Sequence, residues 1–257
     1  MNILILYFSG TGNTKAVAQE LQSALIRREH TVELHAMEDH DYPSSFPYDY
    51  LIIGFPKYYE YPVLYGLDYL NQNLIKGNSK IPTMAYCTQS GDSKTDFSGL
   101  EKILKRKNHI LTTAKSFPYA NNLMIFSMFQ PTPTDQIESN VATIKAEIEP
   151  LLDSFLSGKE RKENVTWWQS FLYRLTAVLF TRAMPIVGMK FSASDECINC
   201  KLCAMKCPRK NIKMVHDRPE FGKHCIFCMR CINSCPKNAI LYNKKKFVQY
   251  LEKGERR

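Results

Sequence analysis

The chain has 257 residues, enough for about two domains at roughly 100–200 residues per domain. Its apolar content of 44% is ordinary for a globular protein, and no run of about 18 uncharged apolar residues argues for a membrane span. No secretory signal is recognisable, so we expect a cytoplasmic protein rather than a small secreted disulfide-rich one. The formal net charge of +9 is the feature that invites a nucleic-acid or membrane interpretation.

The first segment predicts a strand followed by an anion-binding turn. Residues 2–8 form a short apolar run that is typical of a buried parallel strand, and a helix is expected from Lys15 to about Arg28. Between them, two glycines would let backbone amides converge on a phosphate at the positive end of the helix. The candidate phosphate-binding residues are Ser9, Gly10, Thr11, Gly12, Asn13 and Thr14.

The pattern of this loop distinguishes between classes of phosphate ligand. Lys15 does not stand in a Walker frame, and a dinucleotide fingerprint would need glycine at that position. The loop instead resembles the FMN phosphate loop of flavodoxins, [ST]-x-T-G-x-T, here Ser9 to Thr14. The resemblance implies FMN as a cofactor and an α/β, flavodoxin-like, doubly wound parallel sheet with the flavin at the carboxyl ends of its strands.

Further strands are expected near residues 30–36, 50–54, 82–87 and 110–117, and a helix near 134–156 would close the sheet. Flavodoxins place the flavin ring between the loops that follow strands three and four. The resemblance therefore assigns possible ring contacts to Pro56, Tyr58, Thr88, Gln89, Ser90 and Gly91. Tyr58 is the stacking candidate, although these tyrosines could also form a packed surface loop. Cys87 is expected to be a small buried apolar residue.

Residues 158–190 are predicted to form an amphipathic helical linker between domains at 1–157 and 191–257. A charged, solvated hinge at 159–163 precedes apolar residues at helical spacing, and Pro185 with Gly188 should end the helix. We expect the apolar face to dock on the first domain. The alternative is an interfacial membrane helix over 165–182, because basic residues lie nearby. The face comprises Trp167, Trp168, Phe171, Leu172, Leu175, Val178 and Leu179.

Eight of the nine cysteines repeat one pattern, C-x2-C-x2-C-x3-C-P. This is the bacterial two-cluster ferredoxin pattern, in which three thiolates hold one 4Fe–4S cube and the fourth binds the other. Applied here, it assigns one cube to Cys197, Cys200, Cys203 and Cys235. It assigns the other to Cys225, Cys228, Cys231 and Cys207.

The two copies lie 28 positions apart, from Cys197 to Cys225, which suggests a duplicated half-domain. Isoleucines recur at the same offset, and we expect Ile198, Ile212, Ile226 and Ile240 to pack between the cubes. Zinc ribbons use pairs of C-x2-C rather than triplets followed by C-P, and a disulfide framework would suit a small secreted domain.

The whole chain resembles flavodoxin–ferredoxin fusion proteins of anaerobes, in which a flavodoxin-like domain precedes a small α+β two-cluster ferredoxin domain. The resemblance implies an electron-transfer protein that passes electrons between FMN and two 4Fe–4S clusters and on to an external redox protein. The alternative is a flavin-dependent iron–sulfur reductase of a small molecule, with Phe55, Tyr58 and Tyr119 lining its pocket. No nucleophile triad and no nicotinamide fingerprint is visible.

Bound cofactors would change the charge. Two clusters remove about four positive charges and a flavin phosphate about two more, which leaves roughly +3 and argues against a nucleic-acid partner. The remaining cations crowd the cysteine loops, where they are either solvated or attract an acidic redox partner. They are Lys201, Lys206, Arg209, Lys210, Lys213, Arg230 and Lys237.

Overall fold

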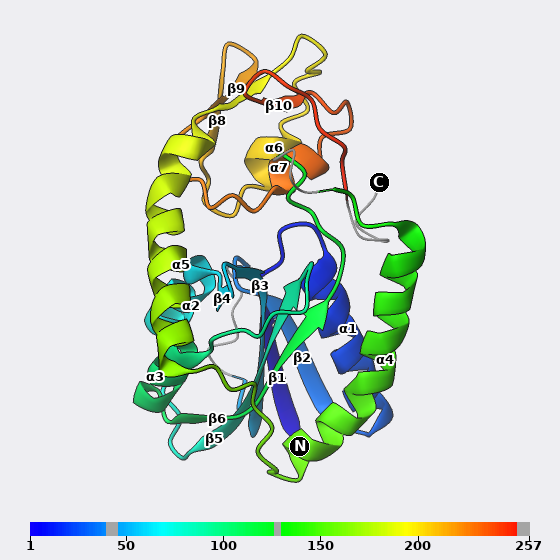
Figure 1. The fold of residues 1–257 in the computed structure, drawn as a ribbon, viewed down its shortest axis with the longest axis vertical. Helices are drawn as coiled ribbons and strands as arrows, with labels where there is room; N and C mark the ends of the chain where they lie inside the picture. The colour runs from blue at the N-terminus through cyan, green and yellow to red at the C-terminus, as the bar shows by residue number, and fades with distance from the viewer. Residues whose placement is uncertain (40–45, 126–129, 251–257) are drawn as a thin grey trace. The chain divides into compact units, whose positions relative to one another are not determined.

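The computed structural model describes residues 1–39, 46–125 and 130–250 (Figure 1). The chain divides by its internal contacts into two compact units. The first comprises Met1–Ser9, Asn13–Tyr119 and Pro133–Ala177. The second comprises Gly10–Gly12, Ala120–Thr132 and Val178–Arg257. Each unit is described by itself below.

A parallel sheet with strand order β2-β1-β3-β5-β6 forms the centre of the first unit. This is the 2-1-3-4-5 order of flavodoxin-like doubly wound folds, and it confirms the predicted fold class. The order reverses between β1 and β3, which creates the topological switch point at their carboxyl ends. The strands are β1 (Asn2–Tyr7), β2 (Thr31–Ala36), β3 (Tyr50–Tyr58), β5 (Ile81–Gln89) and β6 (His109–Pro118).

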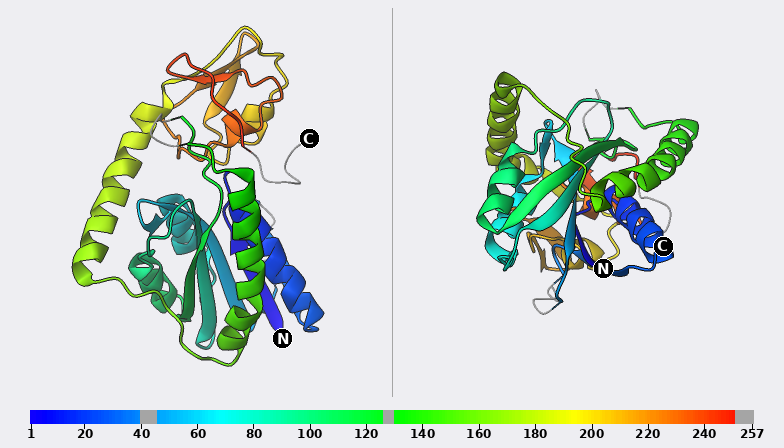
Figure 2. Two further views of the ribbon diagram at one scale, coloured as in Figure 1. Left: turned by 45° about the vertical axis from the view of Figure 1, so that its right-hand side comes forward. Right: turned by 90° about the horizontal axis from the view of Figure 1, so that it is seen from below.

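Helices cover both faces of this sheet, as the view from below in Figure 2 shows. α1 (Asn13–Arg27) contacts α4 (Thr134–Leu156) on one face, and α2 (Leu64–Asn73) contacts α3 (Ser98–Arg106) on the other. Apolar strands between two helical layers explain why their sequences read as continuous apolar runs rather than alternating ones. The predicted first and last helices are confirmed, whereas α2 and α3 were not predicted.

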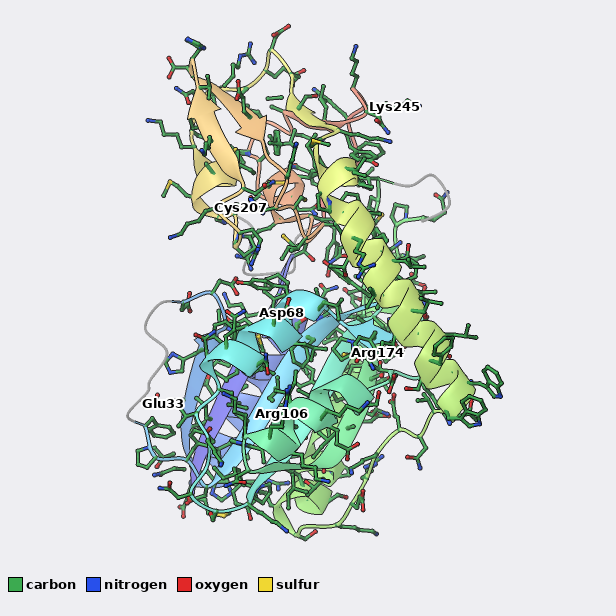
Figure 3. All side chains as sticks on the ribbon, turned by 90° about the vertical axis from the view of Figure 1, so that its left-hand side faces the viewer. Glu33, Asp68, Arg106, Arg174, Cys207 and Lys245 are labelled. Atoms are coloured by element: carbon green, nitrogen blue, oxygen red, sulfur yellow. The ribbon has the colours of Figure 1, made fainter. Side chains whose placement is uncertain are left out.

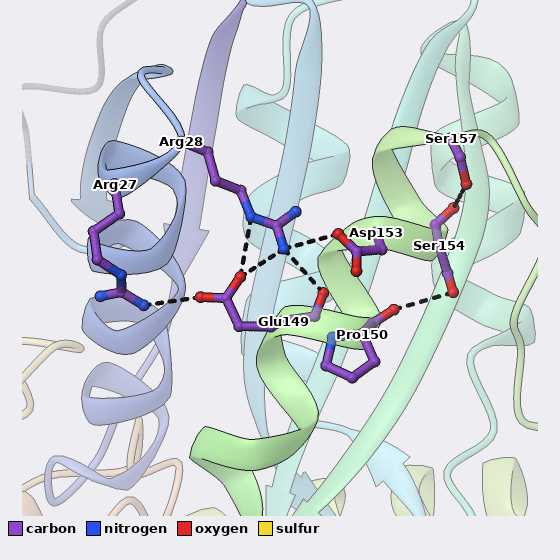
Figure 4. A network of polar contacts seen from close by, with 7 residues as sticks. All are labelled: Arg27, Arg28, Glu149, Pro150, Asp153, Ser154 and Ser157. Carbon is purple, nitrogen blue, oxygen red and sulfur yellow. Dashed lines mark hydrogen bonds and ion pairs between the residues drawn. The ribbon is translucent and has the colours of Figure 1, made fainter.

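An ion-pair network joins the end of α1 to α4 (Figure 4). Arg27 Nη2 lies 2.9 Å from Glu149 Oε1, and Arg28 Nη2 lies 2.5 Å from Glu149 Oε2 and 2.8 Å from Asp153 Oδ1. Hydrogen bonds from both arginines lower the pKa of Glu149. Because the side chains of Arg27, Glu149 and Asp153 are largely solvated, each of these ion pairs should add little to the stability of the fold.

The segment after the third strand is a hairpin rather than the predicted loop. β3 continues to Tyr58 and pairs antiparallel with β4 (Tyr61–Pro62). The two turn residues, Tyr59 and Glu60, have φ of 53° and 57°. Two successive positive φ values are characteristic of a type I′ turn, whose twist matches that of the strands. The prediction failed because such turns are normally signalled by asparagine or glycine.

The predicted solvated hinge is instead bound to the edge of the sheet. Arg161 pairs with β6, since its N–H donates to Thr112 O at 2.9 Å and its carbonyl accepts from Ala114 N at 2.8 Å. The Glu163 carboxylate accepts three hydrogen bonds, from Ser116 N at 2.7 Å, Ser116 Oγ at 2.7 Å and Thr95 N at 3.1 Å. These contacts fix the point from which the following helix begins.

That helix, α5 (Trp167–Gly188), contains Pro185 and ends at Gly188, so Pro185 does not end it. The prediction that its large apolar face is docked is wrong. Six of the seven residues of that face are exposed, from Leu175 at 42% to Trp167 at 68%, whereas Ala177 is buried. α5 is long and apolar enough to cross a membrane, with a mean hydropathy of 1.2, and it alone meets this test among the described helices. Length and composition do not distinguish a span from a helix that lies on a surface.

The second unit contains two small antiparallel sheets and two one-turn helices. β7 (Phe191–Ala193) pairs with β10 (Ile240–Tyr242), and β8 (Ile212–Val215) pairs with β9 (Arg218–Phe221). The helices α6 (Leu202–Met205) and α7 (Arg230–Asn233) lie 28 positions apart. Left-handed backbone positions recur at the same offset, which supports the inferred duplication: Asn199 and Phe227, Lys201 and Met229, Lys210 and Asn238, His216 and Lys244.

Three aromatic rings pack together in the core of this unit. The ring of Phe191 lies 5.7 Å from that of Phe227 and 5.2 Å from that of Tyr242. Ile212 and Ile240 belong to this core, and their packing between the cubes remains a prediction. Ile198 is 56% exposed and, like Ile240, lines one of the two cavities that contain cysteines.

We predict that Glu163→Gln lowers the free energy of unfolding by about 1–3 kcal/mol, because an amide N–H₂ would face donors that need an acceptor. Urea denaturation of the cofactor-loaded protein, followed by far-UV circular dichroism, measures the effect. The matched control is Glu160→Gln, since the Glu160 side chain is 70% exposed in its ion pair with Lys162 and its loss should leave the midpoint unchanged. Equal shifts of the urea midpoint in the two variants would contradict a stabilising role for the three hydrogen bonds that Glu163 accepts, which we call the Glu163 clamp.

Candidate functional site

The loop Ser9–Thr14 connects the carboxyl end of β1 to the first turn of α1. The side chains of Ser9, Thr11, Asn13 and Thr14 are buried, with exposed fractions between 1% and 7%. Gly12 has a φ of 108°, which an L-residue rarely adopts. Neither the loop nor the first turn of α1 carries a carboxylate. A neutral, buried cradle at a helix N-terminus fits a phosphate monoester.

The end of β5 is bonded to this loop. Thr88 Oγ1 lies 2.8 Å from Thr14 Oγ1, and Tyr86 Oη donates to the Thr14 carbonyl at 2.8 Å. Thr88 was predicted as a flavin contact, whereas Tyr86 was missed. Alternation along a strand places residues 86 and 88 on the same face, and this is the signal that would have found Tyr86. The two side chains hold the phosphate loop against the sheet.

The predicted ring contacts differ in burial. Pro56 and Tyr58 are half-buried, whereas Ser90 and Gly91 are exposed. Gln89 is buried, and its Oε1 has no hydrogen-bond partner among the described residues. A buried acceptor of this kind is normally satisfied, so it fits a ligand N–H such as that of the flavin ring. Contact between these residues and the ring remains a prediction.

Lys57, which the sequence analysis missed, links the hairpin after β3 to the loop after β5, the two segments predicted to contact the flavin ring. Its Nζ donates to Ser93 O at 2.9 Å and to Ser93 Oγ at 2.6 Å, while Ser93 Oγ donates to Glu60 Oε1 at 3.1 Å. Burial lowers the pKa of Lys57, and Glu60 opposes that shift. The hairpin and the loop after β5 therefore form one connected surface.

The substrate pocket expected for a reductase is not supported by its residues. Phe55 is fully buried, and its ring packs against Gly66, where a Cβ would lie 2.5 Å from it. Tyr119 is also buried, and its N–H donates to the Gln89 carbonyl at 2.6 Å. Both side chains belong to the packed interior of the first unit. Cys87 is buried as expected.

The eight patterned cysteines of the second unit line two separate cavities. One is lined by Cys197, Cys200, Cys203 and Cys235, and the other by Cys207, Cys225, Cys228 and Cys231. All eight are free thiols. The cavities thus contain the two crossed ligand sets that the sequence pattern assigned. Ligation itself remains a prediction, and no group of described side chains is spaced to chelate a single metal ion.

Burial and mutual proximity oppose ionisation of these thiols. Burial, together with the neighbouring Cys197, Cys200 and Cys235, raises the pKa of Cys203 to about 11. Burial likewise raises the pKa of Cys225 to about 12, together with Cys228 and Cys207. Grouped thiolates therefore require a positive core to neutralise them, which fits iron bound by soft sulfur ligands.

A backbone amide donates to the fourth cysteine of each pattern. Asn211 N donates to Cys207 Sγ at 3.3 Å, and Ala239 N donates to Cys235 Sγ at 3.2 Å. The two bonds are equivalent under the 28-residue offset. Hydrogen bonds to a ligating sulfur stabilise the more negative, reduced form of a cluster.

Family models of known proteins match parts of both units. Residues 5–105 match the family model for flavodoxin, and residues 195–240 match that for a 4Fe–4S dicluster domain. Among solved structures, a flavodoxin from the domain Archaea is 13% identical, covers 60% of this chain and 99% of its own, and has a TM-score of 0.43. Flavodoxin 2 from Bacillus cereus is 21% identical, with 60% of this chain and 100% of that protein covered and a TM-score of 0.39. A mutant of the Pseudomonas aeruginosa flavodoxin is 13% identical, with 62% of this chain and 98% of that protein covered and a TM-score of 0.44. No curated protein matches the chain.

The chain is therefore a fusion of a flavodoxin domain and a 4Fe–4S dicluster domain, as its sequence predicted. Its cofactors are FMN and two 4Fe–4S clusters.

We predict that crossed pairs of cysteines support the same cluster. Cys207→Ala and Cys225→Ala should remove one cluster, and Cys197→Ala and Cys235→Ala the other, each lowering the iron content by about half. Electron paramagnetic resonance of the reduced protein identifies the cluster that remains. Cys87→Ala is the control and should keep both. Identical spectra for Cys207→Ala and Cys197→Ala would contradict the crossed assignment.

We also predict that Gly12→Ala weakens FMN binding by about tenfold or more, because the side chain strains a backbone with φ of 108° within the phosphate loop. Fluorescence titration of the FMN-free protein with FMN measures the dissociation constant. Gly158→Ala is the matched control, because Gly158 also has a positive φ, 73°, but lies outside the loop with open space around it. Equal weakening in both variants would assign the effect to general strain.

Proposed function

We propose that this protein passes electrons between FMN and its two 4Fe–4S clusters and on to an external redox protein. The domain composition establishes an electron-transfer role. The proposed internal relay is supported by one observation above all, the gathering of eight cysteines into two quartets on the chain that carries the flavodoxin domain. The shared chain joins one flavodoxin domain to one dicluster domain.

The combination joins two kinds of electron carrier: when bound, FMN supplies one- or two-electron chemistry and each cluster one-electron chemistry. The protein's own groups would bind the cofactors and adjust their reduction potentials. The neutral loop of Ser9–Thr14 holds the phosphate, and buried Gln89 offers an acceptor. The amides of Asn211 and Ala239 raise the cluster potentials by stabilising negative charge on Cys207 and Cys235. The chain can thereby divide or gather electron pairs.

Cations beside the cysteine cavities favour an acidic redox partner. Lys201 and Lys237 line one cavity, and Arg209 and Arg230 line the other. Lys201, Arg209 and Lys237 are exposed. They reduce the negative charge of the cluster loops and would attract a carboxylate-rich surface to the place where electrons leave. A nucleic-acid partner is not part of the proposal, and the cytoplasm is its proposed location, because cluster thiolates persist in a reducing compartment.

The first experiment is anaerobic purification followed by iron, sulfide and FMN analysis. We expect two 4Fe–4S clusters and one FMN per chain. Clusters without flavin would contradict the proposed function.

We predict that clusters carry electrons from the flavin to the partner. In stopped-flow mixing of the fully reduced protein with an acidic rubredoxin, the double variant Cys203→Ala/Cys231→Ala, which lacks a ligand of each cluster, should oxidise its flavin at least about tenfold more slowly. The physical reason is that the flavin loses its one-electron exit. Cys87→Ala is the control and should react like the unmodified protein.

Salt provides a second readout of the same reaction. If the cations dock an acidic acceptor, the second-order rate should fall as ionic strength rises. Unchanged flavin oxidation in the double variant would refute the relay. A rate independent of salt would refute acidic docking while leaving the relay intact.

A further inference from the structure

The helix α5 presents its large apolar side chains to solvent. At 3.6 residues per turn, six of them fall within one arc of about 100° along the helix. Their exposed fractions lie between 42% and 63%. We call this set the outer stripe: Trp168, Phe171, Leu172, Leu175, Leu179 and Ile186.

The opposite face holds the helix against the protein with small and polar groups. In the first unit, Ser170 Oγ donates to Asp96 Oδ2 at 2.7 Å and lies 3.2 Å from Ser98 Oγ, while Ala177 is buried. A surface helix of a globular protein normally turns its large apolar face to the core. The reversed arrangement of α5 leaves a long apolar surface that needs another partner.

The charged residues of the segment that contains α5 are all positive. From residue 164 to residue 194 the sequence contains no aspartate or glutamate, but it contains Arg174, Arg182 and Lys190. Figure 3 views the protein from the side of α5, with Arg174 labelled. Cations without carboxylates around an apolar face are complementary to an anionic lipid surface.

Two tryptophans mark the beginning of the helix. The rings of Trp167 and Trp168 stack with centroids 3.9 Å apart and are 68% and 59% exposed. Tryptophan is enriched at the level of lipid headgroups, because its ring is apolar and its N–H is polar. Exposing both to water has no evident benefit for the folded chain.

Two other occupants fit less well. A membrane span would pull α5 away from Asp96 and from the Glu163 clamp that precedes it. Pairing with a second copy would bring the carboxylate-free helices together, with Arg174 and Arg182 facing like charges and no compensating acid.

We propose that α5 lies in the surface of an anionic bilayer, with the outer stripe among the acyl chains and its arginines at the lipid phosphates. This inference concerns where the electron carrier works and stands independently of the internal relay.

The test uses flotation of the cofactor-loaded protein with vesicles of phosphatidylcholine alone and of phosphatidylcholine mixed with phosphatidylglycerol. Trp167 and Trp168 are the only tryptophans, so tryptophan emission reports on α5 alone. We expect binding to the anionic vesicles, a blue shift, and stronger quenching by bromines near the headgroups than by bromines deep in the acyl chains.

Substitutions in the outer stripe provide the decisive comparison. Leu172→Gln/Leu179→Gln should lower the partition coefficient by about tenfold for each leucine. Ile26→Gln/Ile110→Gln is the matched control, because these isoleucines have similar exposure, 54% and 43%, outside α5. Arg174→Gln/Arg182→Gln should lower the preference for anionic lipid. Unchanged cofactor content and far-UV dichroism in all variants show that the fold is intact.

Several results would overturn the proposal. These are absence of binding to either vesicle, equal partitioning of the two glutamine double variants, and strongest quenching by deep bromines, which would indicate a span. Self-association that Leu172→Gln/Leu179→Gln abolishes, in a protein that ignores vesicles, would assign the outer stripe to a second copy.

Discussion

The second unit depends on the neutralisation of clustered thiolates. Cys203 and Cys225 are held among other cysteines in a buried setting that raises their pKa values, so the ionised quartets are stable only around a positive core. Regular structure is sparse here, with two-stranded sheets and one-turn helices among the described residues. Metal binding must therefore supply much of the folding free energy that a larger apolar core would supply elsewhere. Cluster assembly and folding of this unit are expected to be one process.

The first unit does not depend on a ligand in this way, because its sheet is complete without one. The loop that would hold the cofactor phosphate lies at the carboxyl end of the central strand β1. The strand order reverses beside β1, which leaves the Ser9–Thr14 loop at an open switch point. Thr88 and Tyr86 then fix Thr14 from the neighbouring strand. The loop is thus preorganised by neutral hydrogen bonds, and the phosphate meets donors without a counter-ion that would have to be desolvated.

Local chemistry was predictable from the sequence, whereas choices made by tertiary packing were not. The cysteine spacing assigned the members of both cavities, and apolar runs located the five parallel strands. The Tyr59–Glu60 turn was missed because nothing in those two residue types signals positive φ. Helical spacing grouped Trp168, Phe171 and Leu175 on one face of α5 but could not show that this face points outward.

The positive charges of the chain serve different purposes in different places. Thiolates and flavin phosphate cancel about six of the nine formal positive charges, and the cations that line the cysteine cavities lie where that negative charge is concentrated. Arg174, Arg182 and Lys190 have no such partner in their own carboxylate-free segment. Three cations along one apolar helix do not form the broad basic face that nucleic-acid binding needs. Beside an apolar stripe, the same few cations suffice to select an anionic bilayer, because each adds to the binding energy of the buried side chains.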